Sequence, residues 1–127
     1  MKNPYVPAKR KTKIVFVQLG SPTAPTAKAL RKFLRNFLGD PRVVDLNPYL
    51  WKVILNCFVL PFRPRRSAKL YARIWDGENF PLIANTEKFT DKVREEIKRL
   101  DPGGLVEVDH AFLLSRPYVS DVYDSWE

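Results

Sequence analysis

Two short apolar runs lie near the two ends of this chain, and both are typical of β-strands. Residues 14–17 are continuously apolar, which is typical of a strand covered on both faces, and residues 105–114 predict a second strand. In the rest of the chain, apolar residues recur every three or four positions, which is the spacing of one face of a helix. Five helices are therefore expected, at about residues 26–38, 47–59, 67–75, 86–100 and 119–126.

The order of these elements predicts the fold class. A strand, several helices, a second strand and a last helix indicate an α/β fold with a parallel crossover. At 127 residues the chain is long enough for one hydrophobic core. Two strands alone do not form a stable, doubly covered sheet. The sheet is therefore expected to be incomplete unless another chain supplies strands.

Composition adds a first indication of partners. The formal net charge of +8 favours anionic partners such as carboxylate ligands, acidic lipids or nucleic acid. Residues 1–12 are interpreted as a basic flexible arm and residues 13–127 as the domain. The absence of a secretory signal and of an apolar run of about 20 residues predicts a cytoplasmic protein. Cys57 lies in an apolar segment and is expected to be a buried, reduced thiol.

The sharpest charge feature is the cluster of Arg63, Arg65 and Arg66, which follows the apolar segment 49–62. Arginine binds carboxylates and phosphates bidentately and stays charged. From charge alone, a solvated basic face is the more frequent explanation of such a cluster. Apolar surface beside fixed guanidinium groups also suits a flat apolar molecule with carboxylates at one end, and a porphyrin has that shape and charge. Composition alone does not separate this ligand from nucleic acid.

His110 is the only histidine, and a lone histidine within a strand is usually structural. It is a weak candidate for an iron ligand. Tyr49, Cys57 and Tyr71 are alternatives, as is the absence of any protein ligand. The sequence contains no metal-ligand spacing, no nucleotide-binding glycine motif and no evident pair of nucleophile and base. The residues by themselves predict a binding domain of the α/β class without visible catalytic groups.

Long blocks of this sequence resemble the N-terminal part of ferrochelatase, which inserts ferrous iron into protoporphyrin. The bacterial family pattern has N-L-G-T-P after a strand, and this chain has Q-L-G-S-P at residues 18–22. The family's F-L-x-D-P-R-V-V-D-L corresponds to residues 37–46, and its L-P-F-R-P-x-x-S-A corresponds to residues 60–68. The resemblance runs from about Lys13 to the end of the sequence. It implies a partial chelatase-like, flavodoxin-like three-layer domain with a short parallel sheet.

The resemblance also implies a tetrapyrrole site, with haem or protoporphyrin as the bound molecule. The residues expected to contact the macrocycle are Leu19, Phe33 and Phe37. The residues expected to face its propionates are Arg63, Arg66 and Tyr71, with Arg65 in the same cluster.

Departures from the family pattern bear on catalysis. The family's G-S-P-L serine, a propionate contact, is missing from residues 78–82, and residues 112–117 carry leucines where relatives have polar groups. The catalytic histidine and acid of the family lie further along its chain. These points predict a truncated, non-catalytic haem- or porphyrin-binding protein, not an enzyme, that acts in haem sensing, buffering or delivery.

Two other functions fit the same residues. One is half of a split ferrochelatase, completed by a separate chain that carries the missing histidine and acid. The other is a regulatory module that binds a haem-pathway enzyme or acidic lipid through the apolar segment, which would place it peripherally at the inner membrane. We further expect a homodimer that buries the uncovered strand edges and closes a porphyrin site between two copies. No nucleic acid is expected as a partner.

Overall fold

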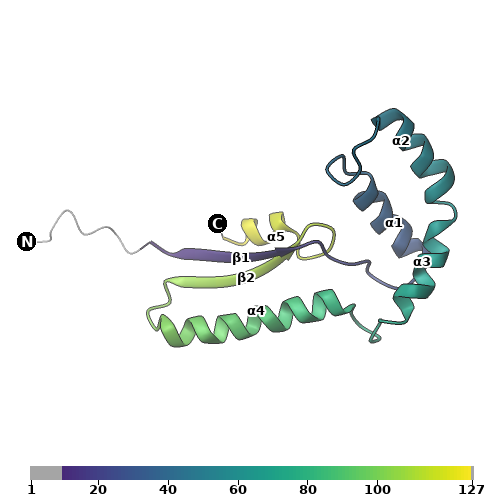
Figure 1. Cartoon of the computed structure of the whole chain (residues 1–127). Coiled ribbons are helices and arrows are strands. Elements are labelled where there is room, and N and C mark those ends of the chain that lie inside the picture. The colour runs from purple at the N-terminus through teal and green to yellow at the C-terminus, as the bar shows by residue number, and fades with distance from the viewer. Residues whose placement is uncertain (1–9, 127) are drawn as a thin grey trace, which may run out of the picture.

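The computed structural model describes residues 10–126 and contains two strands joined through a series of helices (Figure 1). The predicted α/β class, with a short parallel sheet and several helices, is confirmed. Residues 1–9 of the predicted arm lie outside the described residues, and Thr12 already belongs to the first strand. The elements are β1 Thr12–Gln18, α1 Ala27–Leu38, α2 Pro48–Ile54, the π-helix η1 Leu55–Val59, α3 Arg63–Ala72, α4 Pro81–Leu100, β2 Val106–Phe112 and α5 Val119–Asp124.

Side-chain caps explain where the first helices begin. The Thr26 hydroxyl oxygen accepts a hydrogen bond from the Ala29 amide at 3.2 Å, so the predicted cap of α1 is confirmed. Asn47 caps α2 by accepting bonds from two amides, at 3.0 and 3.3 Å, and Pro48 follows at the first helical position. These local signals are strong because each satisfies backbone donors that a helix start leaves unpaired.

Helices α3 and α4 begin earlier than their apolar periodicity predicts. A proline near the start of each helix accounts for both shifts. Pro64 and Pro81 have a backbone angle suited to the first turn, and the N–H group that proline lacks would have no partner within the helix at that position. In α4 the hydroxyls of Thr86 and Thr90 donate to the carbonyls one turn back, at 2.7 and 2.8 Å. Both threonines are therefore buried with their polar groups satisfied.

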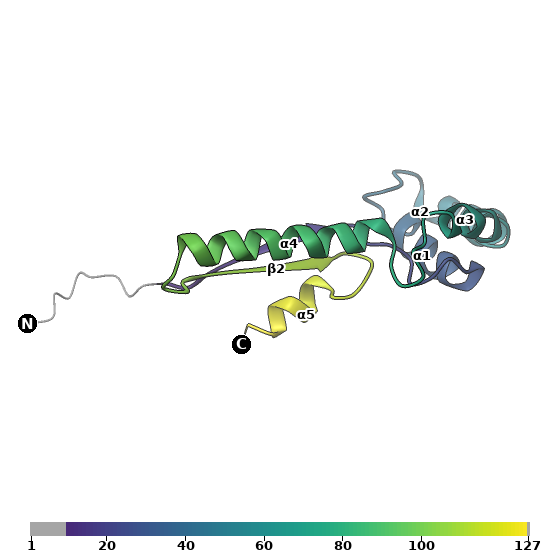
Figure 2. The same ribbon diagram turned by 90° about the horizontal axis from the view of Figure 1, so that it is seen from below.

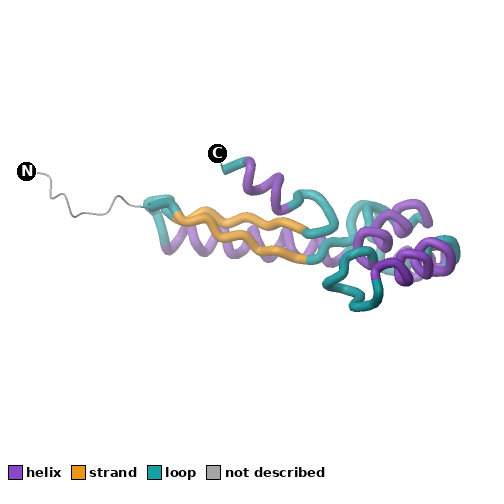
Figure 3. Tube along the Cα trace, turned by 90° about the horizontal axis from the view of Figure 1, so that it is seen from above, coloured by secondary structure: helices purple, strands orange, loops and turns teal. Residues whose placement is uncertain are grey.

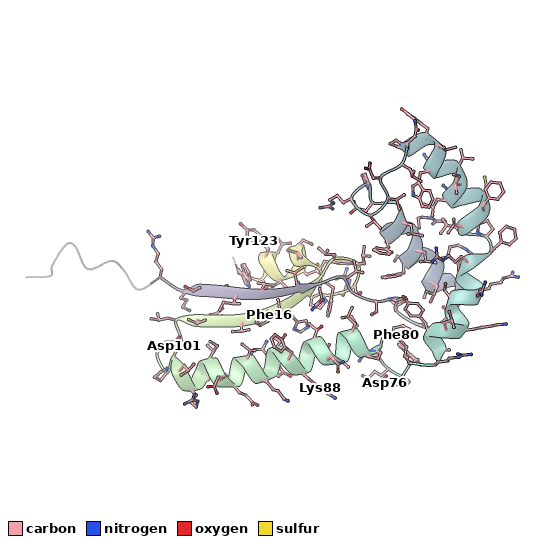
Figure 4. The ribbon with its side chains drawn as sticks, viewed as in Figure 1. Phe16, Asp76, Phe80, Lys88, Asp101 and Tyr123 are labelled. Atoms are coloured by element: carbon pink, nitrogen blue, oxygen red, sulfur yellow. The ribbon has the colours of Figure 1, made fainter. Side chains whose placement is uncertain are left out.

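The two strands pair in parallel, and the register runs from Thr12 opposite Val106 to Gln18 opposite Phe112. Helix α4 packs along one face of the sheet, and the short helix α5 lies on the other side (Figure 2). Phe16 points from β1 toward α4, where its ring meets the edge of Phe89 at a centroid distance of 4.9 Å (Figure 4). The sheet is thus a thin middle layer between helices.

The helices cover the two strands unequally. Both α4 and α5 pack mainly against β2, in which Val108 and Phe112 are buried. In β1, Ile14 is 37% and Val17 48% exposed. The prediction that this strand is covered on both faces is therefore wrong for the described residues, because the helices lie mainly over β2 and α4 meets β1 at Phe16. This outcome agrees with the expectation of an incomplete sheet.

The remaining helices form a limb at the carboxyl end of the strands, in which α2, η1 and α3 follow one another beside α1 (Figure 3). Its core consists of Phe33, Leu34, Leu55 and Leu60. Two side-chain bonds to carbonyls tie its parts together: the Trp51 indole donates to Leu38 at 2.6 Å, and the Arg31 guanidinium donates to Leu60 at 3.2 Å.

Cys57 lies on the outer surface of this limb, in η1. The prediction of a buried thiol is wrong, because the apolar residues around Cys57 in the sequence are distributed over both faces of the helix. Among the described residues, no helix is both long and apolar enough to cross a membrane.

Candidate functional site

The loops that follow the two strands meet and are bonded to each other. The Ser115 hydroxyl accepts a hydrogen bond from the Ser21 amide at 2.7 Å and donates to the Ser21 carbonyl at 2.9 Å. Gly20 has φ +98°, and a Cβ there would lie 2.2 Å from the Ser115 oxygen. Glycine is therefore required for the close approach of the two loops. Both serines are buried, so this junction is rigid.

A cleft opens beside this junction, between the strand ends and α1. We call it the strand-end cleft, and it encloses about 210 Å³. Ligands of open α/β sheets bind at the carboxyl ends of the strands, which is where this cleft lies. It is lined by Ser21, Pro22, Thr23, Ala29, Lys32, Phe33, Asn36, Leu114, Ser115, Arg116 and Tyr118.

Apolar and cationic groups adjoin each other in the strand-end cleft. Phe33 and Leu114 bring apolar surface from the core of the helical limb. Lys32 and Arg116 bring positive charge, and both are exposed. This combination suits an apolar ligand that carries carboxylates.

A second depression lies on the outer side of the helical limb, where η1 meets α3. We call it the α3 hollow, and it holds about 560 Å³. It is more open to solvent than the cleft, since Phe58 is 67%, Phe62 70% and Leu70 55% exposed. It is lined by Phe58, Val59, Phe62, Arg63, Arg66, Ser67 and Leu70.

The predicted macrocycle contacts do not gather at one place. Phe33 lines the strand-end cleft but is only 8% exposed, because most of its ring packs in the limb core. Phe37 stacks on Phe33 at a centroid distance of 6.0 Å and lines neither depression. Leu19 is 39% exposed, and its carbonyl accepts a bond from the Leu114 amide at 2.9 Å. Of the three, Phe33 is the one that the structure brings to the cleft.

The predicted propionate contacts are also separated. Arg63 and Arg66 line the α3 hollow, three residues apart on one side of the helix. Arg65 is exposed on another side of α3 and does not line the hollow. Tyr71 is turned inward, with its ring edge-on to Phe80 at a centroid distance of 5.3 Å. Helical spacing therefore divides a cluster that looks continuous in the sequence.

His110 lies in β2, away from both depressions. Its ring meets Phe112 edge-on at 5.6 Å, and its Nδ1 atom is buried without a hydrogen-bond partner. The nearest carboxylate oxygen belongs to Asp109, at 3.9 Å. Within residues 10–126, no three acidic, histidine or cysteine side chains come together as a set that could hold a metal ion.

The two cationic side chains of the cleft and its one amide side chain were missed by the sequence interpretation. Lys32 and Asn36 stand one helical turn apart on α1, which is the spacing that places side chains on one face. That spacing indicates a shared polar face, although α1 was interpreted only through its apolar face. Arg116 had no such signal, because only the fold brings the loop after β2 to α1.

Curated relatives align with most of this chain. A coproporphyrin III ferrochelatase of Streptococcus mutans is 41% identical over 119 residues, which cover 94% of this chain and 37% of that protein. A ferrochelatase of Marinomonas is 41% identical over 106 residues, which cover 84% of this chain and 32% of that protein. A ferrochelatase of Methylobacillus flagellatus is 50% identical over 90 residues, which cover 69% of this chain and 26% of that protein. The chain thus spans about a third of the length of such relatives.

These relatives correct the prediction that the protein is not an enzyme. They are named ferrochelatases, and ferrochelatases are enzymes. The prediction rested on catalytic side chains that are missing from the sequence. An active site gathers residues from distant parts of a polypeptide, so a match to about a third of each relative gives no ground for excluding catalysis.

A model of the ferrochelatase family matches residues 11–127, which is nearly the whole chain. The matched region includes both strands, all the helices of the described residues and both depressions. The sequence blocks that suggested the resemblance occupy the end of β1 and the loop after it, the end of α1 with the loop that follows, and the start of α3. The chain belongs to the ferrochelatase family.

Proposed function

We propose that this chain supplies the tetrapyrrole-binding part of a ferrochelatase-type enzyme, which inserts ferrous iron into a porphyrin. The substrate class follows from the names of the relatives, one of which is a coproporphyrin III ferrochelatase. Iron is a substrate in this reaction, and the proposal assigns no iron ligand to the described residues. The proposal concerns the part of the site that this chain carries.

The observation that carries the proposal is the composition of the strand-end cleft. A tetrapyrrole is a flat apolar ring with carboxylates on its edge. Leu114 and the small part of Phe33 that remains exposed provide apolar surface, and burying that surface contributes about 25 cal/mol per Å² removed from water. Lys32 and Arg116 are placed to pair with the carboxylates, and Asn36 adds an amide donor.

The size of the cleft supports a role as one wall of a site. Small-molecule sites usually enclose roughly 300–1,000 Å³, whereas this cleft encloses about 210 Å³. We therefore infer that other parts of a ferrochelatase cover the opposite face of the ring. Whether those parts stand on the same polypeptide or on a second one, as in the split-enzyme alternative, does not change the groups that this chain contributes.

The arginines of α3 remain proposed carboxylate contacts. Arg63 and Arg66 stand beside the exposed rings of Phe58 and Phe62, so the α3 hollow also combines apolar surface with positive charge. We rank it second, because its aromatic walls, Phe58 and Phe62, are exposed and free to rotate, whereas Phe33 in the cleft is held by the limb core. Holding such side chains in place on binding lowers the net gain in free energy.

The outer side of the limb is also the surface for the proposed peripheral membrane contact of a cytoplasmic protein. Tyr49, Leu50 and Val53 are more than half exposed on α2, which is followed by η1 and the residues of the hollow. Apolar side chains beside arginines are the usual features of a helix that lies on an anionic membrane.

The test is an absorbance titration of the purified chain with coproporphyrin III, protoporphyrin and hemin. Saturable binding is expected, and Lys32→Ala combined with Arg116→Ala should weaken it about tenfold, since exposed ion pairs contribute about 0–1 kcal/mol each. Lys88→Ala is the matched control, because Lys88 is an exposed cation on α4 (Figure 4). Absence of tetrapyrrole binding, or equal weakening by the control, would contradict the proposed site.

The enzymatic part of the proposal needs a separate measurement. Iron insertion is assayed with this chain and a second polypeptide made from the part of the Streptococcus mutans enzyme that it does not match. Turnover is expected for the mixture, with a lower rate for the Lys32→Ala, Arg116→Ala variant. A mixture that forms a complex and binds porphyrin but does not turn over would argue against an enzymatic role for this chain.

A further inference from the structure

Arg116 stands on the loop after β2, and the backbone of this loop is fixed on both sides of it. On one side, the buried Ser115 hydroxyl is bonded to both the amide and the carbonyl of Ser21. On the other side, the Phe112 amide donates a hydrogen bond to the Pro117 carbonyl at 2.8 Å. Because both neighbours of Arg116 are bonded to other segments, the fold determines where its side chain begins.

The side chain of Arg116 is 80% exposed, yet two nearby groups direct it. Its Nη1 atom donates to the Asp121 carboxylate at 3.4 Å, and its guanidinium carbon lies 5.5 Å from the centroid of the Tyr118 ring. A guanidinium at this distance is attracted to the face of an aromatic ring. These contacts favour one direction of a side chain that would otherwise rotate in solvent.

Asp121 is itself held by the start of α5. Its Oδ2 atom accepts a hydrogen bond from the Tyr118 amide at 2.9 Å. Tyr118 precedes the helix and Asp121 is its third residue, which is the spacing at which an acidic side chain bonds to the amide of a helix start. The same carboxylate oxygen therefore joins Arg116 to the first turn of α5.

Arg116 lines two depressions of different charge. One is the strand-end cleft, where Lys32 is the other cation. The second is an open depression of about 610 Å³ that Arg116 forms with Pro117, Asp121 and Asp124. Its two carboxylates repel an anionic ligand, whereas Lys32 attracts one. A ligand carboxylate is therefore expected to reach Arg116 from the cleft.

The contact with Asp121 compensates the charge of Arg116 only in part. The separation of 3.4 Å is long for a hydrogen bond, and the Asp121 oxygen also accepts the shorter bond from Tyr118. The donors of a guanidinium form a rigid fork. With Nη1 directed to Asp121, Nε and Nη2 form the side of the fork that can bind a carboxylate through two parallel bonds.

We propose that Asp121 is a positioning residue for Arg116, which it holds beside the strand-end cleft with Nε and Nη2 directed to a carboxylate of the tetrapyrrole. This inference rests on the proposed function, because it assigns a role within the same cleft. A free arginine side chain loses rotational freedom when it binds a ligand. A side chain that Asp121 and Tyr118 already direct loses less of it, so the ligand is bound more tightly.

An absorbance titration of the full chain with coproporphyrin III tests this role. Asp121→Asn keeps an oxygen that can accept from the Tyr118 amide but removes the ionic contact with Arg116, and it should weaken binding about threefold, as expected for an exposed ion pair. Asp124→Asn is the matched control. It removes the same charge from the same depression, and within residues 10–126 no ion pair joins Asp124 to Arg116. The control should bind at least as tightly as the unmodified chain.

A double-mutant cycle separates positioning from support of the helix start. In an Arg116→Ala background, Asp121→Asn should cause no further loss of affinity, since its effect passes through the guanidinium. Coproporphyrin III tetramethyl ester, which has no free carboxylate, should bind the unmodified chain and the Asp121→Asn variant equally.

The outcomes distinguish this role from the proposed function. Absence of coproporphyrin binding by the unmodified chain would contradict the proposed function and this role with it. Binding by the unmodified chain that Asp121→Asn leaves equal or tighter overturns the positioning role alone. An equal loss in the presence and absence of Arg116 also overturns it, because Asp121 would then act only on the helix start.

Discussion

The strand-end cleft and the α3 hollow both place cations beside apolar rings, yet they are built in different ways. The cleft rests on two buried loops held by the paired bonds between Ser21 and Ser115, which lie 94 residues apart in the chain. The hollow consists of side chains one helical turn apart on a single exposed limb. Two cationic side chains line each depression, so charge does not distinguish them, whereas rigidity does. A rigid wall retains more of the binding free energy.

The largest expected effect comes from Gly20→Ala, which acts on the cleft alone. The new Cβ meets the Ser115 oxygen and also requires a left-handed backbone, so the free energy of unfolding should fall by about 2–4 kcal/mol. Gly77→Ala is the matched control, since Gly77 has φ +101° but nothing within 4 Å of its Cβ position. The control should lose about 1 kcal/mol. Urea unfolding measures both, and equal losses would show that the loop contact is unimportant.

Ser115→Ala should affect the strand-end cleft and leave the α3 hollow intact. It removes both bonds to Ser21 and leaves a buried amide and carbonyl unpaired, so a loss of roughly 1–3 kcal/mol in unfolding free energy is expected. Porphyrin affinity should fall as well, because the cleft loses its rigid wall. Ser67→Ala, in the α3 hollow, should change stability by less than about 0.5 kcal/mol. A larger effect of Ser67 on porphyrin titration would reverse the ranking of the two sites.

Replacing the three arginines Arg63, Arg65 and Arg66 by alanine tests the hollow directly. If the cleft is the main site, the triple variant should weaken porphyrin binding by only about threefold, since exposed ion pairs contribute about 0–1 kcal/mol. Arg65→Ala alone should have no effect, because Arg65 does not line the hollow. An effect of the triple variant that exceeds that of Lys32→Ala with Arg116→Ala would make the α3 hollow the principal carboxylate site.

The smallest expected effect concerns the junction that joins the helical limb to α4, near Asp76 (Figure 4). Hydrogen bonds from the amides of Asn79 and Glu78 lower the pKa of Asp76 below its ordinary value of 3.8. The folded state therefore gains stability above pH 3.8 and loses it as pH falls through the lower, folded-state pKa. Asp76→Asn should flatten this part of the stability–pH profile. If the variant loses unfolding free energy with falling pH as steeply as the unmodified protein, protonation of Asp76 is not coupled to folding.

Much of the local structure could be predicted from the sequence. Thr26, Asn47 and Pro48 mark helix starts with chemistry that acts within a few residues, and such signals do not depend on the rest of the fold. The long motif blocks identified the family for the same reason, since they are read along the chain. The parallel crossover also followed from the order of elements alone.

Which of these residues share a surface depends on how distant segments pack together. The sequence placed Phe33 and Arg63 in one site, but the packing of α1 buries most of Phe33 and helical spacing turns Arg63 toward the α3 hollow. Arg116 reaches the cleft only because parallel pairing brings the loop after β2 beside α1. Burial and proximity depend on contacts between distant segments, and hydrophobic periodicity carries no information about which segment will provide the cover.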